Sequence, residues 1–175
     1  MDLAAFLRPT SRIRSLQGDV VRADCPLFRE FFPPSVTFLI RLDEVDWGGV
    51  PPNGITPLEY PKPLTAADAE YLDDDNIVFG IAVNGDARAY PKRILVWYEM
   101  AADRGGWLEL SIVYCTLCGT VIPHENLIDR EHIRFGASGL WYRSNKLMFD
   151  QETKSLWNTF EGVAAIDSLA GSDCS

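Results

Sequence analysis

The chain has 175 residues, of which 47% are hydrophobic, so it is long enough to form one domain with a substantial core. Its 25 acidic residues outnumber the 16 basic ones, and the net charge of -9 argues against nucleic-acid binding because polyanions would be repelled. The sequence holds no apolar run of the roughly 18–20 residues that a membrane-spanning helix needs, and its N-terminal residues lack the apolar region of a secretory signal.

Residues 1–63 are predicted to form an irregular arm. They hold nine of the eleven prolines, and proline removes the hydrogen-bond donors that helices and sheets need. The apolar piece over 27–32 would pin this arm against the rest of the protein, whereas exposure of its Phe28, Phe31 and Phe32 would let the arm gain order against a protein partner. Residues 64–175 are predicted to form a β-rich domain.

The first half of that domain predicts a short helix, a hairpin and a second helix. Thr65 is a suitable N-cap for a helical turn or two through residue 72. An apolar run over 77–83 leads into Asn84-Gly85, a strong hairpin signal because both residues tolerate positive φ, and the chain returns over 87–90. Pro91 suits the first position of a helix that runs through residue 98.

The second half predicts a series of short strands. A strand over 107–114 is followed by a turn with two cysteines, and then by strand-like segments over 119–122, 132–136, 140–143, 146–149 and 155–158. Residues 150–154 are expected to form a hairpin loop in which Asp150 bonds back to turn amides. The pattern indicates an α+β fold, a β-dominated single domain of short, mostly antiparallel strands with one or two helices.

The stretch VYCTLCGTVIPHE places Cys115 and Cys118 three residues apart in the predicted turn. A zinc knuckle uses such a pair, but structural zinc needs four ligands, and the sequence has no second Cys-x-x-Cys. A thioredoxin-type redox pair precedes a helix, whereas β-leaning residues follow here. A transition metal (zinc, copper or iron), a redox pair and an inert turn all remain open.

Other side chains are candidates for a supporting role at the cysteine pair. His124 would reach back toward the cysteine turn if the two flanking strands pair, and Glu99 is a carboxylate beside an apolar helix face, where a shifted pKa is expected. The stretch around Ser138 reads Gly-x-Ser-Gly-Leu and departs from the hydrolase elbow, so its glycines predict a bulge or a close backbone approach instead. The full set of supporting candidates is Arg88, which would pair with Glu99 or Asp103, together with Ser138, Asp150 and Trp157.

Four segments in this order, ARAYP, YCTLCGT, FGASG and FDQETKSLW, resemble an uncharacterised prokaryotic family, domain of unknown function number thirty-one seventy-nine. The resemblance covers roughly residues 50–170. It implies an extracytoplasmic or organellar location, because many family members look exported or lipid-anchored. It also implies that the domain continues beyond Gly171. Family members carry Trp-His-Glu where this chain has Trp97-Tyr98-Glu99, so Tyr98 replaces a possible imidazole ligand.

The resemblance implies no reaction, so the sequence leaves two classes of function. The first is a non-catalytic accessory subunit that docks into a larger assembly through its proline-rich arm, and Tyr98 would mark the loss of an older site. The alternative is a metal-binding or thiol-redox protein that uses Cys115 and Cys118, with His124, Glu99 or Tyr98 beside them.

Overall fold

The computed structural model describes residues 26–32, 37–128, 130–166 and 169–174. Strands dominate these residues, and their one α-helix is α3 (Lys92–Tyr98). Three short 3-10 helices complete the helical content, η1 (Pro26–Phe31), η2 (Leu42–Glu44) and η3 (Ala66–Asp68). The predicted β-dominated α+β class is confirmed.

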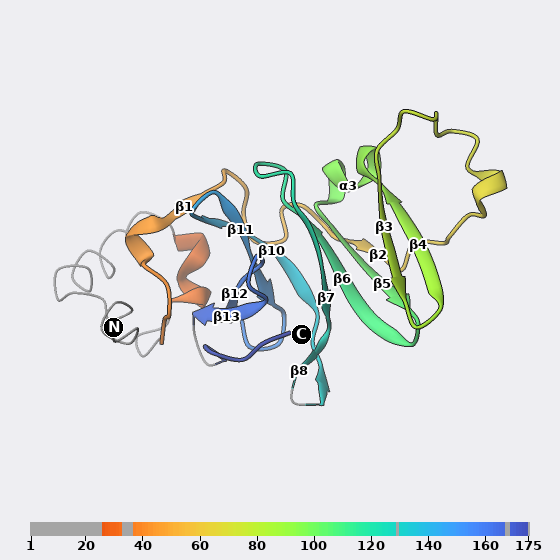
Figure 1. The fold of residues 1–175 in the computed structure, drawn as a ribbon. Helices are drawn as coiled ribbons and strands as arrows, with labels where there is room; N and C mark the ends of the chain where they lie inside the picture. The colour runs from red at the N-terminus through yellow and green to blue at the C-terminus, as the bar shows by residue number, and fades with distance from the viewer. Residues whose placement is uncertain (1–25, 33–36, 129, 167–168, 175) are drawn as a thin grey trace, which may run out of the picture.

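Two sheets form the centre of the molecule (Figure 1). The five-stranded sheet is antiparallel throughout, in the order β1 (Val45–Trp47), β10 (Phe135–Tyr142), β11 (Asn145–Asp150), β12 (Leu156–Asn158) and β13 (Val163–Ile166). The four-stranded sheet has the order β2 (Leu58–Glu59), β5 (Met100–Gly105), β6 (Leu108–Tyr114) and β7 (Val121–Glu125), with only β2 parallel to its neighbour. Two further hairpins are β3 (Val78–Val83) with β4 (Asp86–Pro91), and β8 (Leu127–Ile128) with β9 (Glu131–His132).

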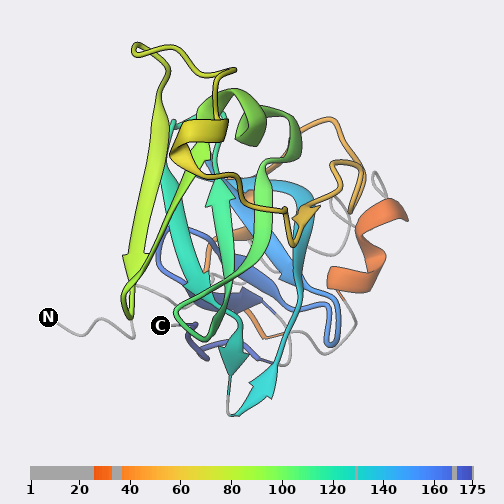
Figure 2. The same cartoon turned by 90° about the vertical axis from the view of Figure 1, so that its right-hand side faces the viewer.

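The elements stack as layers, and alternate residues of a central strand face different layers because side chains point to opposite faces of a strand. Leu147 and Phe149 of β11 pack on the side of η1, whereas Met148 faces the four-stranded sheet and packs with its Met100. On the outer face of the four-stranded sheet, Ile112 packs beneath the β3–β4 hairpin, which stands beside that sheet in Figure 2.

Local sequence signals predicted the β3–β4 hairpin correctly and the short helices on either side of it in part. Asn84 and Gly85 form the turn with φ of 48° and 81°. Thr65 caps η3 by accepting a hydrogen bond from the amide of Asp68, although only one 3-10 turn forms. Pro91 is the N-cap of α3 rather than its first helical residue.

Strand β5 (Met100–Gly105) was not predicted because its sequence, MAADRG, is poor in the residues that favour strands. It forms because it pairs with β6 on one side and with β2 on the other. Tertiary pairing therefore overrides local preference here.

The alternative in which Phe28, Phe31 and Phe32 are exposed is wrong. All three are buried against the five-stranded sheet, and the ring of Phe31 lies 5.0 Å from that of Phe149. The proline-rich segment also contributes β1 and β2 as edge strands. Residues 1–25 and 33–36, which also belong to the predicted arm, lie outside the described residues.

The glycines of the FGASG motif have the structural role that the sequence predicted. The register between β10 and β11 shifts between Ala137 and Leu140, which is a bulge. Gly139 has φ of +78°, and a Cβ there would collide with the backbone oxygen of Val50. The motif thus lets the segment that follows β1 lie directly on β10.

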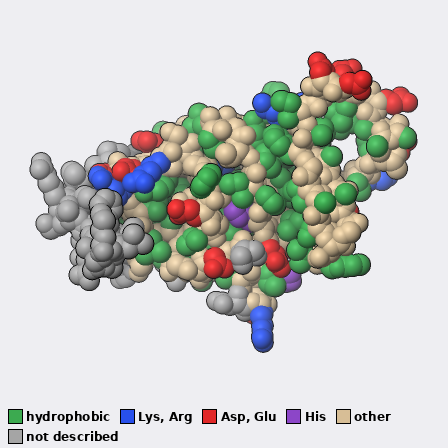
Figure 3. Space-filling model, in the orientation of Figure 1, with side chains coloured by type: hydrophobic (Ala, Val, Ile, Leu, Met, Phe, Trp, Pro, Cys, Tyr) green, Lys and Arg blue, Asp and Glu red, His purple; other side chains and the backbone are tan. Residues whose placement is uncertain are grey.

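Acidic side chains gather at the loop that precedes β3, where Asp73, Asp74 and Asp75 are exposed (Figure 3). Such exposure is typical of a run of like charges in a solvated loop. Among the described residues, no helix is long and apolar enough to span a membrane.

Candidate functional site

The cysteine turn joins β6 to β7 at one end of the four-stranded sheet. Its backbone closes through two hydrogen bonds, because the amide of Cys115 donates to the oxygen of Thr120 and the amide of Gly119 donates to the oxygen of Cys115. Gly119 has φ of +71°, a conformation that glycine adopts without strain. The result is a compact loop that brings its two cysteines together.

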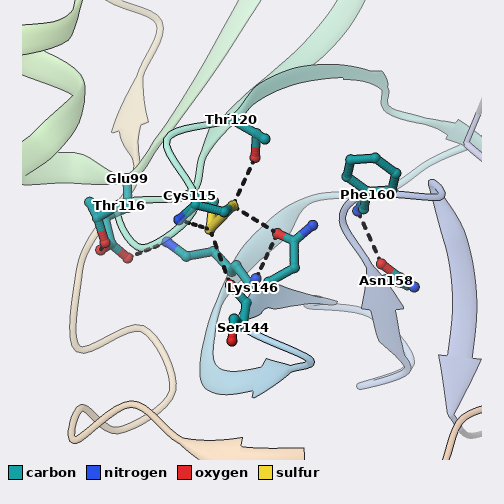
Figure 4. The surroundings of a disulfide bond; sticks show 10 residues. Glu99, Cys115, Thr116, Thr120, Ser144, Lys146, Asn158 and Phe160 are labelled. Atoms are coloured by element: carbon teal, nitrogen blue, oxygen red, sulfur yellow. Dashed lines mark hydrogen bonds and ion pairs between the residues drawn. A yellow bond between two sulfur atoms is a disulfide. The ribbon is translucent and has the colours of Figure 1, made fainter.

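Cys115 and Cys118 are bonded to each other as a disulfide, with their Cα atoms 5.7 Å apart. The two ends of this disulfide differ in exposure, because Cys115 is 0% exposed and Cys118 lies at the surface. The amide of Cys118 points to the Sγ of Cys115 at 3.4 Å. The Sγ of Cys118 lies 3.1 Å from the hydroxyl of Thr120 and 3.7 Å from Oδ1 of Asn145 (Figure 4).

A cavity of about 350 Å³ lies beside the exposed sulfur. Its lining comes from the cysteine turn, the β10–β11 turn and the segment after β12, and consists of Cys118, Thr120, Tyr142, Arg143, Ser144, Asn145, Asn158, Phe160 and Glu161. These side chains offer amides, hydroxyls and two aromatic rings, and Phe160 is exposed at the rim. Cys118 is therefore the sulfur that a molecule in the cavity would meet.

The β10–β11 turn, which forms one wall of this cavity, has an unusual backbone. Arg143 and Ser144 both have positive φ, 49° and 64°, at positions where a two-residue hairpin normally carries asparagine or glycine. The turn is supported by an ion pair of Arg143 with Glu44, and the Oδ1 of Asn145 accepts a hydrogen bond from the amide of Lys146 at 2.8 Å. Such strain is common at functional sites.

Behind the disulfide, Glu99 and Lys146 form a buried ion pair (Figure 4). Lys146 is 4% exposed and Glu99 is 7% exposed. The second carboxylate oxygen of Glu99 accepts a hydrogen bond from the hydroxyl of Thr116, in the cysteine turn, at 3.0 Å. Burial lowers the pKa of Lys146, and the hydrogen bond to Glu99 acts in the opposite direction. The carboxylate predicted at Glu99 is thus connected directly to the cysteine turn.

The backbone conformation of Glu99 itself directs its carboxylate toward Lys146. Glu99 is the C-cap of α3 in the left-handed conformation, with φ of 56°, and its amide donates to the oxygen of Leu95. Its own backbone oxygen accepts from the amide of Tyr114, the last residue of β6. These two bonds hold the carboxylate beside the end of β6, where the cysteine turn begins.

His124 lies elsewhere in the structure. It pairs with Ser111 near the end of β6–β7 that is away from the cysteine turn, and its Nδ1 lies 3.4 Å from the Sγ of Cys174. Burial lowers the pKa of His124 to about 4 and raises the pKa of the Cys174 thiol to about 12. The structure therefore gives His124 a partner that the sequence did not suggest.

The remaining predicted residues are also outside the immediate surroundings of the disulfide. Tyr98 ends α3 and is 38% exposed. Arg88 pairs with Asp103 and Asp86 rather than with Glu99. Ser138 donates to the backbone oxygen of Leu147 inside the five-stranded sheet.

Asp150 and Trp157 belong to a buried network at the far end of β11. Asp150 accepts hydrogen bonds from the amide and the hydroxyl of Thr153, as the predicted turn requires, and from Nε1 of Trp157 at 3.0 Å. This network stabilises the β11–β12 connection, and the contacts of both side chains are structural.

Sequence reasoning missed Lys146, Thr116 and Asn145. One signal was available, because Lys146 stands two residues before the apolar Met148 in a predicted strand, and alternation would turn both side chains inward. The turn residues carried no such signal, since only tertiary structure brings the β10–β11 turn to the cysteine turn.

The metal site predicted at Cys115 and Cys118 needs thiolate ligands, whereas in this structure the two sulfurs are bonded to each other. No group of three or more histidine, cysteine, aspartate or glutamate side chains is gathered as metal ligands within the described ranges. Metal binding by the reduced pair stays a prediction.

Comparison with known proteins agrees with the resemblance seen in the motifs. No curated protein and no solved structure matches the chain. The family described as "Protein of unknown function (DUF3179)" matches residues 52–174, a range that contains both cysteines of the disulfide as well as Glu99 and Lys146. The chain therefore belongs to the DUF3179 family.

Proposed function

We propose that this protein is a thiol–disulfide exchange protein whose reactive group is the Cys115–Cys118 pair. The observation that carries the proposal is the unequal exposure of the two sulfurs, because Cys118 faces a cavity whereas Cys115 is fully buried. A pair that exchanges disulfides needs one sulfur that a partner can reach and a second that resolves the mixed disulfide.

The exchange uses the thiols of the partner and needs no further reactant. A partner thiolate attacks the Sγ of Cys118, a new sulfur–sulfur bond forms, and the bond to Cys115 breaks so that Cys115 leaves as a thiolate. A second partner thiolate then attacks the partner sulfur of the mixed disulfide and releases Cys118 as a thiolate. The partner dithiol is oxidised to a disulfide and the protein pair is reduced to two thiols; the reverse sequence reduces a partner disulfide.

Hydrogen-bond donors around the pair suit both thiolates. The amide of Cys118 points to the Sγ of Cys115, and the hydroxyl of Thr120 lies within reach of the Sγ of Cys118. Hydrogen bonds to the charged form of a group favour that form, so these donors favour ionised sulfur. The strained β10–β11 turn that forms the facing wall supports the same assignment.

Single cysteine variants test the proposal. Cys115→Ser leaves the reachable sulfur without its resolving partner, so the reduced protein is expected to form a stable mixed disulfide with oxidised glutathione. Cys118→Ser leaves only the buried sulfur, and its mixed disulfide is expected to form at least about tenfold more slowly because access limits the reaction. Mass spectrometry of the peptide that contains both positions reads each product.

The proposal fails if Cys115→Ser forms no mixed disulfide, or if the two variants react at the same rate. The wild-type pair supplies the control, because it is expected to resolve to the internal disulfide. Circular dichroism checks that both variants are folded, so that slow reaction is not a consequence of unfolding.

The accessory-subunit function predicted from the proline-rich arm stays a prediction. The burial of Phe28, Phe31 and Phe32 removes the exposed residues that had motivated it. The predicted extracytoplasmic or organellar location fits the redox proposal, since structural and catalytic disulfides persist in oxidising compartments.

A further inference from the structure

Lys146 is unusual because it is a lysine at the interior of a two-sheet protein, with a single ion-pair partner among the described residues. Its side chain faces the same layer as Met148, between the two sheets, and its ammonium meets the carboxylate of Glu99. A buried charge is costly, and a lone buried ion pair is weak evidence for stability. A role in the chemistry of the adjacent disulfide gives a reason for the pair.

Four contacts place the ion pair beside the disulfide. Glu99 accepts from Thr116, which follows Cys115 in the chain, and the amide of Lys146 donates to Asn145, whose Oδ1 lies 3.7 Å from the Sγ of Cys118. The Sγ of Cys115 lies 3.9 Å from the backbone oxygen of Ser144, two residues before Lys146. Figure 4 shows the lysine side chain running past the disulfide toward Glu99.

The other charges near this region are directed elsewhere. Arg143, in the β10–β11 turn, pairs with Glu44, and its guanidinium lies over the ring of Tyr142. Glu161, across the cavity, accepts a hydrogen bond from Asn158. Among the described residues, Lys146 and Glu99 are thus the charged pair that lies beside the buried end of the disulfide, next to Thr116 of the cysteine turn.

Reduction changes the charge at that end. When the bond opens from the cavity side, Cys115 becomes a thiolate at a site with no solvent exposure, where burial disfavours the charged form. A neighbouring ammonium stabilises the thiolate, and a neighbouring carboxylate destabilises it.

We propose that Lys146 stabilises the thiolate of Cys115 when the disulfide opens, and that Glu99 is a positioning residue that holds the ammonium in the interior while the disulfide is closed. This inference rests on the proposed exchange function of the cysteine pair. It assigns to the site a cation that sequence reasoning did not identify. The two residues should therefore influence the Cys115 thiol in opposite directions.

The test measures the pKa of the Cys115 thiol in a Cys118→Ser background, where the disulfide cannot form. Protein labelled with carbon-13 at the cysteine Cβ reports the titration of each cysteine separately by NMR. An added or removed charge within about 4–6 Å shifts a pKa by about 1–3 units. The Cys115 pKa in Lys146→Met is therefore expected to exceed that in Glu99→Gln by at least about one unit, with the parent between them.

A smaller separation, or the reversed order, overturns the inference. If Lys146→Met does not fold because it leaves Glu99 unpaired in the interior, the double variant Glu99→Gln/Lys146→Met replaces it, since it buries no unpaired charge. Its Cys115 pKa is expected to exceed that of Glu99→Gln by the same margin. Lys62→Met, which removes an exposed lysine, is the matched control and should leave the Cys115 pKa unchanged.

The experiments distinguish a failure of the role proposed for Lys146 from a failure of the proposed exchange function. If mixed disulfides form at Cys118 as expected but the pKa order is absent, only the role of Lys146 fails. If the pKa order is present but no mixed disulfide forms at Cys118, the exchange function fails although the electrostatic coupling exists.

Discussion

Nδ1 of His124 lies 3.4 Å from the Sγ of Cys174, fifty residues further along the chain, and both side chains are buried between the two sheets. Burial keeps both groups neutral, because it lowers the pKa of His124 and raises that of Cys174. This contact joins Cys174 to His124 near the end of β7. It also makes the stability of the fold depend on pH.

The pKa of His124 is about 4 in the folded protein against an ordinary value of 6.5, so between these values the unfolded chain binds the proton and the folded chain does not. The free energy of unfolding is therefore expected to fall as the pH drops below 6.5, by about 2 kcal/mol between pH 7.5 and pH 5 from this residue. Urea unfolding at the two pH values measures it. His124→Gln removes this contribution, so an equal pH dependence in both proteins would contradict the assignment.

The cysteines are expected to differ in reactivity once the disulfide is reduced in native buffer. In a Cys25→Ser background, an alkylating reagent should modify Cys118 quickly, because this residue is exposed. Cys174 should react roughly a thousandfold more slowly than an ordinary thiol at neutral pH, because burial raises its pKa to about 12. Peptide mass spectrometry over a time course distinguishes the two sites, and rapid labelling of Cys174 would show that its environment is more open than described.

Gly139→Ala should destabilise the protein by at least about 2 kcal/mol, since a Cβ at φ of +78° is strained and would meet the backbone oxygen of Val50. Gly80→Ala is the matched control. A Cβ at Gly80 meets nothing within 4 Å, and the substitution should change the free energy of unfolding by no more than about 0.5 kcal/mol. Chemical denaturation compares the pair, and equal effects would mean that the approach of the residue 50 segment to β10 is unimportant.

Phe31→Ala is expected to cost about 3–5 kcal/mol, because the ring is fully buried beside Phe149 and its removal leaves a cavity. Phe160→Ala removes a ring that is 64% exposed and should change stability by no more than about 0.5 kcal/mol. Thermal and urea unfolding measure the change in stability of each variant. If Phe31→Ala leaves the free energy of unfolding unchanged, η1 does not contribute to the folded core.

Local patterns in the sequence were sufficient for elements whose geometry is decided within a few residues. The β3–β4 hairpin follows from Asn84-Gly85 between two strand-like runs, and the Asp150 turn follows from a side chain that bonds to nearby amides. The bulge at the FGASG motif is of the same kind. Strands β13 (Val163–Ile166) and β5 were not predicted from the sequence, because pairing with neighbouring strands, rather than their own residues, decides their conformation.

By itself, the sequence determined that a tight turn would bring Cys115 and Cys118 together, because two residues three apart, followed directly by Gly119, need only local backbone geometry. Tertiary structure alone decided which sulfur is buried, that Glu99 meets Lys146, and that His124 meets Cys174. The physical reason is that these contacts join residues 47 and 50 positions apart, which come together only when the two sheets pack. Burial of the ion pair, and the lowered pKa of Lys146 with it, is likewise a property of that packing.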